Sequence, residues 1–96
     1  MNVELRTRVI DRLRSVIDPE TGADVVRMRL VEDLEVDDRG LVRYTFRPSS
    51  PLCPLAVTLA LQIKQAVAGV PGVIRQEIAV EGYAGAESLS ELLREA

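Results

Sequence analysis

The 96-residue sequence has no histidine, no tryptophan and only one cysteine, Cys53. Without histidine, imidazole-based acid–base catalysis and imidazole metal ligation are excluded. One cysteine cannot form a disulfide within the chain, and this composition predicts the reducing cytoplasm as the location. The sequence also has no apolar run close to the roughly 18 residues of a membrane span, so no membrane partner is expected.

The chain also lacks an excess of positive charge. It carries 15 acidic and 12 basic residues, for a net charge of −3. Nucleic-acid binding needs a clustered basic surface, and the N-terminal arginines are interleaved with Glu4 and Asp11. We therefore expect no nucleic-acid partner. The length and an apolar share of 47% predict one folded domain over residues 1–96.

Hydrophobic spacing predicts the elements of the first half. Apolar residues at three- and four-residue spacing predict a helix over residues 3–17, ended by Pro19. Alternation predicts extended structure over 25–36, with an interruption near Glu32–Asp33. The segment "DDRG" (37–40) predicts a hairpin turn. On the returning strand, one face is expected to carry Val42, Tyr44 and Phe46, and the other Arg43, Thr45 and Arg47.

The second half predicts a helix, a strand and a short helix. Residues 55–68 are apolar over most of a helical circumference, and 73–82 alternate as a strand does. Ser88 and Glu91 form a capping-box pattern that predicts a C-terminal helix over 87–96. The fold class is therefore α+β, with the order α-β-β-α-β-α. A small mixed sheet of about three strands is expected to pack against helices, mainly on one face.

The segment "SSPLCPLA" (49–56) places the single thiol in a stiff frame. Pro54 is expected at the first position of the second helix, where a missing N–H costs nothing, so Cys53 is expected at or next to its N-cap. Helix-terminal N–H groups, with Ser49 and Ser50 upstream, would stabilise a thiolate there. The alternative is that Cys53 is a small buried hydrophobe, as free cysteines commonly are.

Asp18 and Glu20, in the segment "DPE", are the second candidate site. They could ligate a metal or orient the thiol, whereas a local turn is the simpler interpretation of a D-P-x segment. One chain supplies one thiolate, while an iron–sulfur cluster normally takes four. Any metal contact by Cys53 would therefore be labile and completed from outside the chain. Arg43, Thr45 and Arg47 could form a partner-binding face or merely solvate the sheet.

These segments, together with "GVPGVIRQEIAV", resemble the iron–sulfur cluster assembly family that includes SufT-like and PaaD-like proteins. The resemblance covers about residues 5–81 and implies an iron–sulfur cluster assembly domain-like fold. By position, Asp18, Pro19 and Glu20 match the acidic turn, Cys53 the reactive cysteine, and Pro51 and Pro54 its flanking prolines. Arg29 and Leu52 stand where glycine is common, which adds bulk around the site.

The resemblance implies an accessory factor in iron–sulfur cluster assembly or insertion, and not a turnover enzyme. Its implied partners are assembly proteins and client apoproteins. No cofactor would be bound permanently, and a cluster or iron would be carried transiently. Two alternatives stay open: a non-catalytic adaptor that docks assembly machinery, and a component of an oxygenase complex of the PaaD type. A homodimer that brings two Cys53 thiols together is a further open hypothesis.

Overall fold

The computed structural model describes residues 2–95 and confirms the predicted α+β order. Its elements are α1 (Val3–Leu13), β1 (Val31–Val36), β2 (Leu41–Phe46), α2 (Ala56–Ala68), β3 (Arg75–Val80) and α3 (Ala86–Glu95). The sheet has the order β1-β2-β3, with β1 antiparallel and β3 parallel to β2. None of the helices within 2–95 has the length and apolar character needed to cross a membrane.

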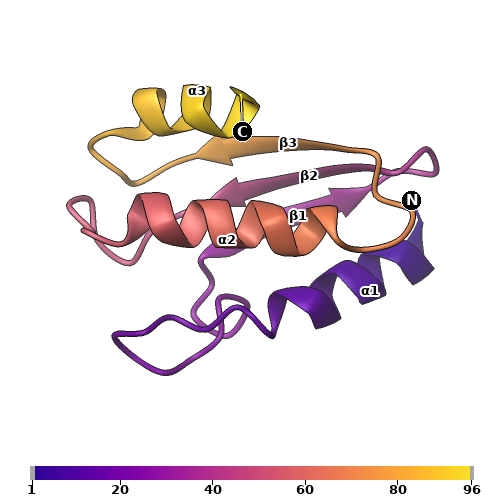
Figure 1. Ribbon diagram of the computed structural model, residues 1–96, viewed down its shortest axis with the longest axis horizontal. Coiled ribbons are helices and arrows are strands. Elements are labelled where there is room, and N and C mark those ends of the chain that lie inside the picture. Colours follow the sequence, from indigo (N-terminus) through magenta and orange to yellow (C-terminus); the bar gives the residue numbers. More distant parts are fainter. Residues whose placement is uncertain (1, 96) are drawn as a thin grey trace.

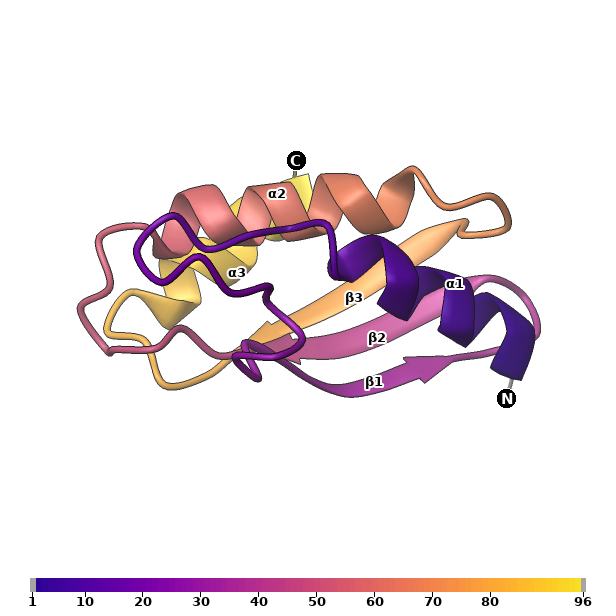
Figure 2. The same ribbon diagram turned by 90° about the horizontal axis from the view of Figure 1, so that it is seen from below.

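The helices lie on one side of the sheet. Figure 1 shows α1 and α2 in front of the strands, and Figure 2 shows them above the sheet, with α3 beside β3. The opposite face of the sheet has no covering element among the described residues. This arrangement explains the alternation on β2: Val42, Tyr44 and Phe46 are buried beneath the helices, while Arg43 and Arg47 are exposed.

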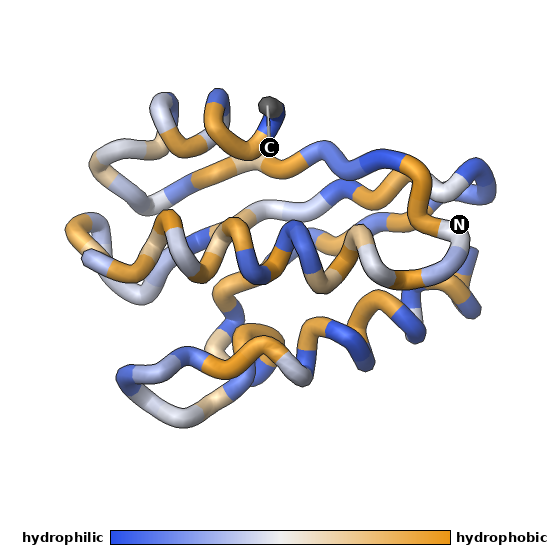
Figure 3. Tube along the Cα trace, viewed as in Figure 1, coloured by the Kyte–Doolittle hydropathy of each residue, from blue (hydrophilic) through white to orange (hydrophobic). Residues whose placement is uncertain are grey.

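The core joins both long helices to the sheet. α1 contributes a stripe with the 3.6-residue period, and α2 contributes a wider apolar surface, visible as the mostly orange tube in Figure 3. Burying one such side chain stabilises the fold by roughly 1.5–3 kcal/mol. The residues that carry this contact are Leu5, Val9 and Leu13 of α1, and Leu59, Ile63 and Val67 of α2.

The β1–β2 hairpin confirms the predicted turn. Oδ1 of Asp37 accepts hydrogen bonds from the backbone N–H of Arg39 at 2.8 Å and of Leu41 at 3.0 Å. Gly40 takes a φ of 92°, a conformation that favours glycine. The predicted interruption of β1 is also confirmed, since the register shifts between Glu32 and Glu35. Asp33 has a φ of 55° at that point.

The predicted end of the first helix, near Ile17, is wrong. α1 ends at Leu13 because the following segment pairs with a later one instead of continuing the helix. The N–H of Val25 donates to the carbonyl of Val16 at 3.0 Å, and Ile17 forms an isolated β-bridge with Asp24. Apolar spacing cannot distinguish a last helical turn from such a buried pairing.

The predicted strand over residues 25–30 is also wrong. This stretch is a turn, in which the N–H of Leu30 donates to the carbonyl of Val25 at 3.0 Å. Oδ1 of Asp24 accepts from the N–H of Arg27 at 2.9 Å, as a capping side chain does. Arg29 has a φ of 58°. Glycine adopts this left-handed backbone conformation most easily, but here an arginine occupies it.

The capping box predicted for the C-terminal helix is wrong as well. α3 begins at Ala86, so Ser88 lies inside the helix and not at its start. The first turn closes through the N–H of Leu89, which donates to the carbonyl of Gly85 at 2.9 Å. Leu89 and Leu93 pack into the core. The predicted end at residue 96 lies outside the described residues.

Candidate functional site

Three loops meet at one end of the molecule. Parallel strands end at the same edge of a sheet, so the segments that follow β2 and β3 leave together. β1 runs the other way, so the segment that leads into it lies at that end too. Figure 1 shows these three segments, residues 14–30, 47–55 and 81–85, at the left of the molecule. They contain every candidate residue predicted from the "DPE" and "SSPLCPLA" segments.

The cysteine loop, residues 49–55, is held by short-range hydrogen bonds. The N–H of Cys53 donates to the carbonyl of Ser50 at 3.2 Å, and the N–H of Leu52 donates to Oγ of Ser50 at 3.2 Å. Cys53 is only 6% exposed, whereas the neighbouring Leu52 is 79% exposed. The thiol therefore lies beneath the surface while its neighbour projects into solvent.

The prediction that Cys53 lies at or next to the N-cap of α2 is wrong. The N-cap of α2 is Leu55, so Pro54 precedes the helix and Cys53 comes before that. The intervening turn is closed by the N–H of Ala56, which donates to the carbonyl of Cys53 at 3.3 Å. Leu55 provides no side-chain cap, so the next N–H groups of the first turn have no capping oxygen from it. They point out of the helix beside the cysteine loop.

The acidic turn separates its two carboxylates. Asp18 is 3% exposed, and its Oδ1 accepts a hydrogen bond from the backbone N–H of Glu20 at 2.8 Å. Its carbonyl accepts from the N–H of Gly22 at 2.8 Å. Glu20 is exposed. Within residues 2–95, no hydrogen bond or ion pair joins either carboxylate to the cysteine loop. Asp18 thus builds the local turn that the D-P-x pattern favours.

The loop after β3 supports the cysteine loop, a role that sequence reasoning missed. The N–H of Ala84 donates to the carbonyl of Pro51 at 2.8 Å, and Tyr83 packs against the core. The segment "YAGA" has the composition of a simple connection. No local signal in it predicts this contact, because the contact depends on where β3 ends relative to β2.

The predicted partner face carries ion pairs. Arg43 contacts Glu77 with an Nε–Oε2 distance of 3.0 Å. Arg47 contacts Glu81 at 3.2 Å and Glu32 at 3.7 Å. All of these side chains are at least one third exposed, and such surface pairs contribute little to stability. The guanidinium groups of this open face are therefore partly neutralised by carboxylates of β1, of β3 and of the residue that follows β3.

The chemistry that this end of the molecule offers is that of one thiol. Within residues 2–95, no group of three or more histidine, cysteine, aspartate or glutamate side chains is placed to hold a metal ion. The donor set does not fit a resident cluster, which takes about four thiolates. Cys53 could contribute one ligand to a cluster or an iron ion whose other ligands come from another molecule.

Comparison with known proteins identifies a family and relatives that match most of the chain. The family described as "Iron-sulfur cluster assembly protein" matches residues 6–80. The Fe-S protein maturation auxiliary factor YitW of Bacillus subtilis is 36% identical over 81% of this chain and 76% of its own. The Fe-S protein maturation auxiliary factor SufT of Staphylococcus aureus is 35% identical over 66% of this chain and 72% of its own.

A solved structure shares the fold. The crystal structure of a DUF59 domain from Bacillus anthracis superposes with a TM-score of 0.73 and 27% identity. The superposition covers 96% of this chain and 90% of that one. The segment that the family matches, residues 6–80, includes both the acidic turn and the cysteine loop. The family resemblance inferred from those two segments is therefore confirmed.

Proposed function

The chain belongs to the iron–sulfur cluster assembly protein family, and from this membership we propose that it acts as an accessory factor in which Cys53 contacts the cargo. The observation that carries the proposal is the match over residues 6–80, which contains the acidic turn and the cysteine loop together. The relatives named as maturation auxiliary factors support an accessory role over a turnover enzyme.

In this proposal the cargo is an iron–sulfur cluster or an iron ion in transit to a client apoprotein. Cys53 supplies one thiolate ligand, and the assembly partner or the client supplies the others. The uncapped first turn of α2 lies next to the cysteine loop, and its N–H groups favour negative charge there. A shared site of this kind releases its cargo readily, which suits delivery.

Burial of Cys53 requires the cysteine loop to open before it meets its cargo. The loop is held to the rest of the chain by few backbone hydrogen bonds, chiefly that from Ala84 to Pro51. Leu52, at 79% exposed, offers an apolar contact beside the thiol. We infer that docking of an assembly partner on Leu52 opens the loop and exposes the thiol.

The experiment is maturation of a client iron–sulfur enzyme in a strain whose only copy of this chain is Cys53→Ser. Loss of client activity, with a folded and normally abundant variant, is the expected result. Ser88→Ala is the control, because it changes an exposed serine of α3 outside the three loops and leaves the thiol in place. Full client activity with Cys53→Ser would remove the thiol from the mechanism.

The buried position of Cys53 favours one second candidate function, an adaptor that docks assembly machinery through the open sheet face. In that case Cys53 only packs, and Arg43, Thr45 and Arg47 form the docking surface. Arg43→Glu would then abolish client maturation while Cys53→Ser would be tolerated. The same maturation assay separates the two candidates, because each predicts the opposite pattern for these two variants.

A further inference from the structure

The outer edge of β3 has no neighbouring strand among residues 2–95. β3 is last in the sheet order, and it pairs with β2 on one side only. On that side the N–H groups of Ile74 and Arg75 both donate to the carbonyl of Gly40, and the N–H of Glu81 donates to that of Phe46. Backbone groups alternate in direction along a strand, so the N–H and C=O of Gln76 and Ile78 point to the open edge. Such an edge is a template for another strand.

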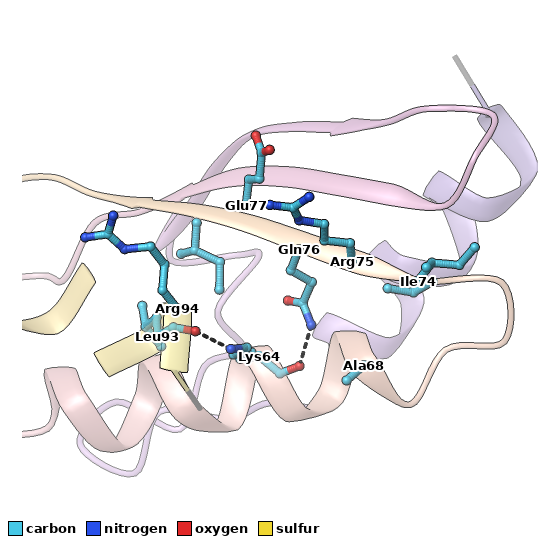
Figure 4. Close-up of a pocket in the computed structure, with 10 residues that line it drawn as sticks. Lys64, Ala68, Ile74, Arg75, Gln76, Glu77, Leu93 and Arg94 are labelled. Carbon is cyan, nitrogen blue, oxygen red and sulfur yellow. Dashed lines mark hydrogen bonds between the residues drawn. The ribbon is translucent and has the colours of Figure 1, made fainter. Parts of the chain in front are cut away.

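The first half of β3 borders a groove of about 730 Å³. Figure 4 shows Lys64 and Ala68 of α2 on one side, and Leu93 and Arg94 at the end of α3 on another. At the far end lies Ile74, which is 81% exposed. α3 therefore flanks only the later part of β3, and the stretch 74–78 is accessible. The Gln76 side chain is hydrogen-bonded to the Lys64 carbonyl, so Gln76 offers its backbone N–H and C=O, and not its side chain, to an added strand.

The charges on the open face of the sheet alternate from strand to strand. Glu35 of β1 pairs in register with Arg43 of β2, and Arg43 with Glu77 of β3. The Arg43–Glu77 ion pair is 3.0 Å long. Cross-strand neighbours of opposite charge stabilise a sheet, so a strand added beyond β3 fits best with a cation opposite Glu77.

We propose that a second copy of this chain adds its β3 to this edge, antiparallel, with Gln76 opposite Gln76 of the partner subunit. Arg75 then faces Glu77 of the partner subunit, and Glu77 faces the partner's Arg75, so the two-fold axis creates two opposite-charge pairs. On the other face, Ile74 meets Ile78 of the partner subunit and loses its exposure. The sheet continues across the interface with six strands.

Neighbouring registers fit worse. Centring the axis on Glu77 sets it against Glu77 of the partner subunit, so two carboxylates oppose each other across the interface. Centring it on Ile78 sets Glu77 against Ala79 of the partner subunit, leaves Ile74 uncovered and moves the pairing beneath α3. The free backbone groups of Gln76 and Ile78 are compatible with each of these registers. The charge pattern and the apolar residues select the one centred on Gln76. Figure 3 shows the polar stretch 75–77 between two apolar ones.

This dimer leaves the two cysteine loops apart. Because the paired strands are antiparallel, the loop end of each copy points away from that of the other, so the dimer does not join two Cys53 thiols. The proposal rests on the β3 edge and not on cargo binding at Cys53.

The dimer is expected to be weak and to depend on concentration. A pairing of five residues per strand buries less surface than the roughly 800 Å² per partner of a standard interface.

Sedimentation velocity of the full chain over about a hundredfold range of concentration tests the proposal. The expected result is a shift from monomer to dimer. Arg75→Glu is expected to weaken the dimer at least tenfold, because carboxylates then face each other at both pairs. Arg75→Lys, which keeps the cation opposite Glu77 of the partner subunit, is expected to leave the dimer intact. Arg27→Glu changes the net charge as Arg75→Glu does, but on a distant exposed turn. It is expected to dimerise as the unaltered chain does.

Backbone hydrogen exchange supplies a second measurement that needs no variant. Exchange at the Gln76 N–H is expected to slow as the concentration rises, while exchange at Arg75, already bonded to Gly40, stays constant. A monomer at every concentration would overturn the proposal. So would a dimer that Arg75→Glu leaves intact, or a folded Arg75→Lys variant that stays monomeric.

Discussion

The hydroxyl of Tyr44 donates a 2.7 Å hydrogen bond to Oε1 of Gln76 on the neighbouring parallel strand. Nε2 of Gln76 donates in turn to the carbonyl of Lys64 at 2.9 Å, and Nζ of Lys64 donates to the carbonyl of Leu93. Burial raises the pKa of Tyr44, which keeps the hydroxyl protonated as the donor. One polar chain thus links β2, β3, α2 and α3.

Tyr44→Phe is expected to lower the free energy of unfolding by about 1–2 kcal/mol, because it leaves Oε1 of Gln76 without its donor in a partly buried site. Urea denaturation measures this change. Tyr83→Phe is the matched control, since no hydrogen bond of the Tyr83 hydroxyl is found within the described residues, and it should change stability much less. Equal losses from the two variants would show that the Tyr44 hydrogen bond contributes nothing.

Two glycines with positive φ are expected to differ in their tolerance of a methyl group. A Cβ at Gly40 would lie 2.3 Å from the carbonyl oxygen of Gly72, whereas a Cβ at Gly22 would meet nothing within 4 Å. Gly22→Ala should cost only the backbone strain of about 1–2 kcal/mol. Gly40→Ala should cost more, since backbone must also move. Urea midpoints of the two variants test this order, and a smaller loss for Gly40→Ala would contradict it.

Replacing Arg29 by glycine is expected to stabilise the folded chain. Its φ of 58° costs an L-residue roughly 1–2 kcal/mol, which glycine avoids. Arg27, two residues earlier, has no positive φ. Arg29→Gly should therefore be more stable than Arg27→Gly by about 1–2 kcal/mol in thermal or urea unfolding. Identical effects would mean that the turn relaxes at no cost.

The stability of the β1–β2 hairpin is expected to fall in acid because of Asp37. Backbone hydrogen bonds from Leu41 and then Arg39 hold the pKa of this carboxyl below its usual value of 3.8. The native state therefore favours the carboxylate, and that stabilisation is present above pH 3.8 and is lost as the pH falls through the lowered pKa. Asp37→Asn retains an acceptor oxygen without the charge.

The measurement for Asp37 is the difference in urea midpoint between the unaltered chain and Asp37→Asn as a function of pH. We expect a constant difference near neutral pH that shrinks below pH 3.8. A difference that persists unchanged into strong acid would mean that the charge of Asp37 is not the stabilising factor.

Cys53 is expected to react slowly with an alkylating reagent in the folded chain, because it is 6% exposed. The rate should rise at least about tenfold on unfolding, since an opening free energy of about 1.4 kcal/mol is enough for that factor. Alkylation followed by mass spectrometry measures both rates. Fast reaction in the native chain would mean that the cysteine loop is already open without a partner.

Local patterns in the sequence predicted much of the fold. The hairpin turn at 37–40 follows from an aspartate that accepts backbone N–H bonds and a glycine that takes positive φ. The burial of Val42, Tyr44 and Phe46 follows from the two-residue period of a strand. The mixed sheet was expected because the helix before β3 provides the crossover that a parallel strand needs. The segments "DPE" and "SSPLCPLA" are local patterns too, and they were enough to predict which two loops carry the candidate residues.

Long-range pairing decided what local patterns could not. Val16 and Val25 hydrogen-bond to each other, which ends α1 at Leu13 and turns residues 25–30 away from the sheet. Packing of the cysteine loop against the core buries Cys53 and moves the N-cap of α2 to Leu55. The strand order leaves β3 at the edge, with Arg75 and Glu77 on its open face.

The sequence by itself determined which elements form, because hydrogen-bonding and apolar periodicity act over a few residues. Only the tertiary structure decided where these elements stop, whether the thiol is covered and which strand edge stays open. Those outcomes depend on contacts between residues far apart in the chain, and on competition between local and distant partners for the same backbone groups.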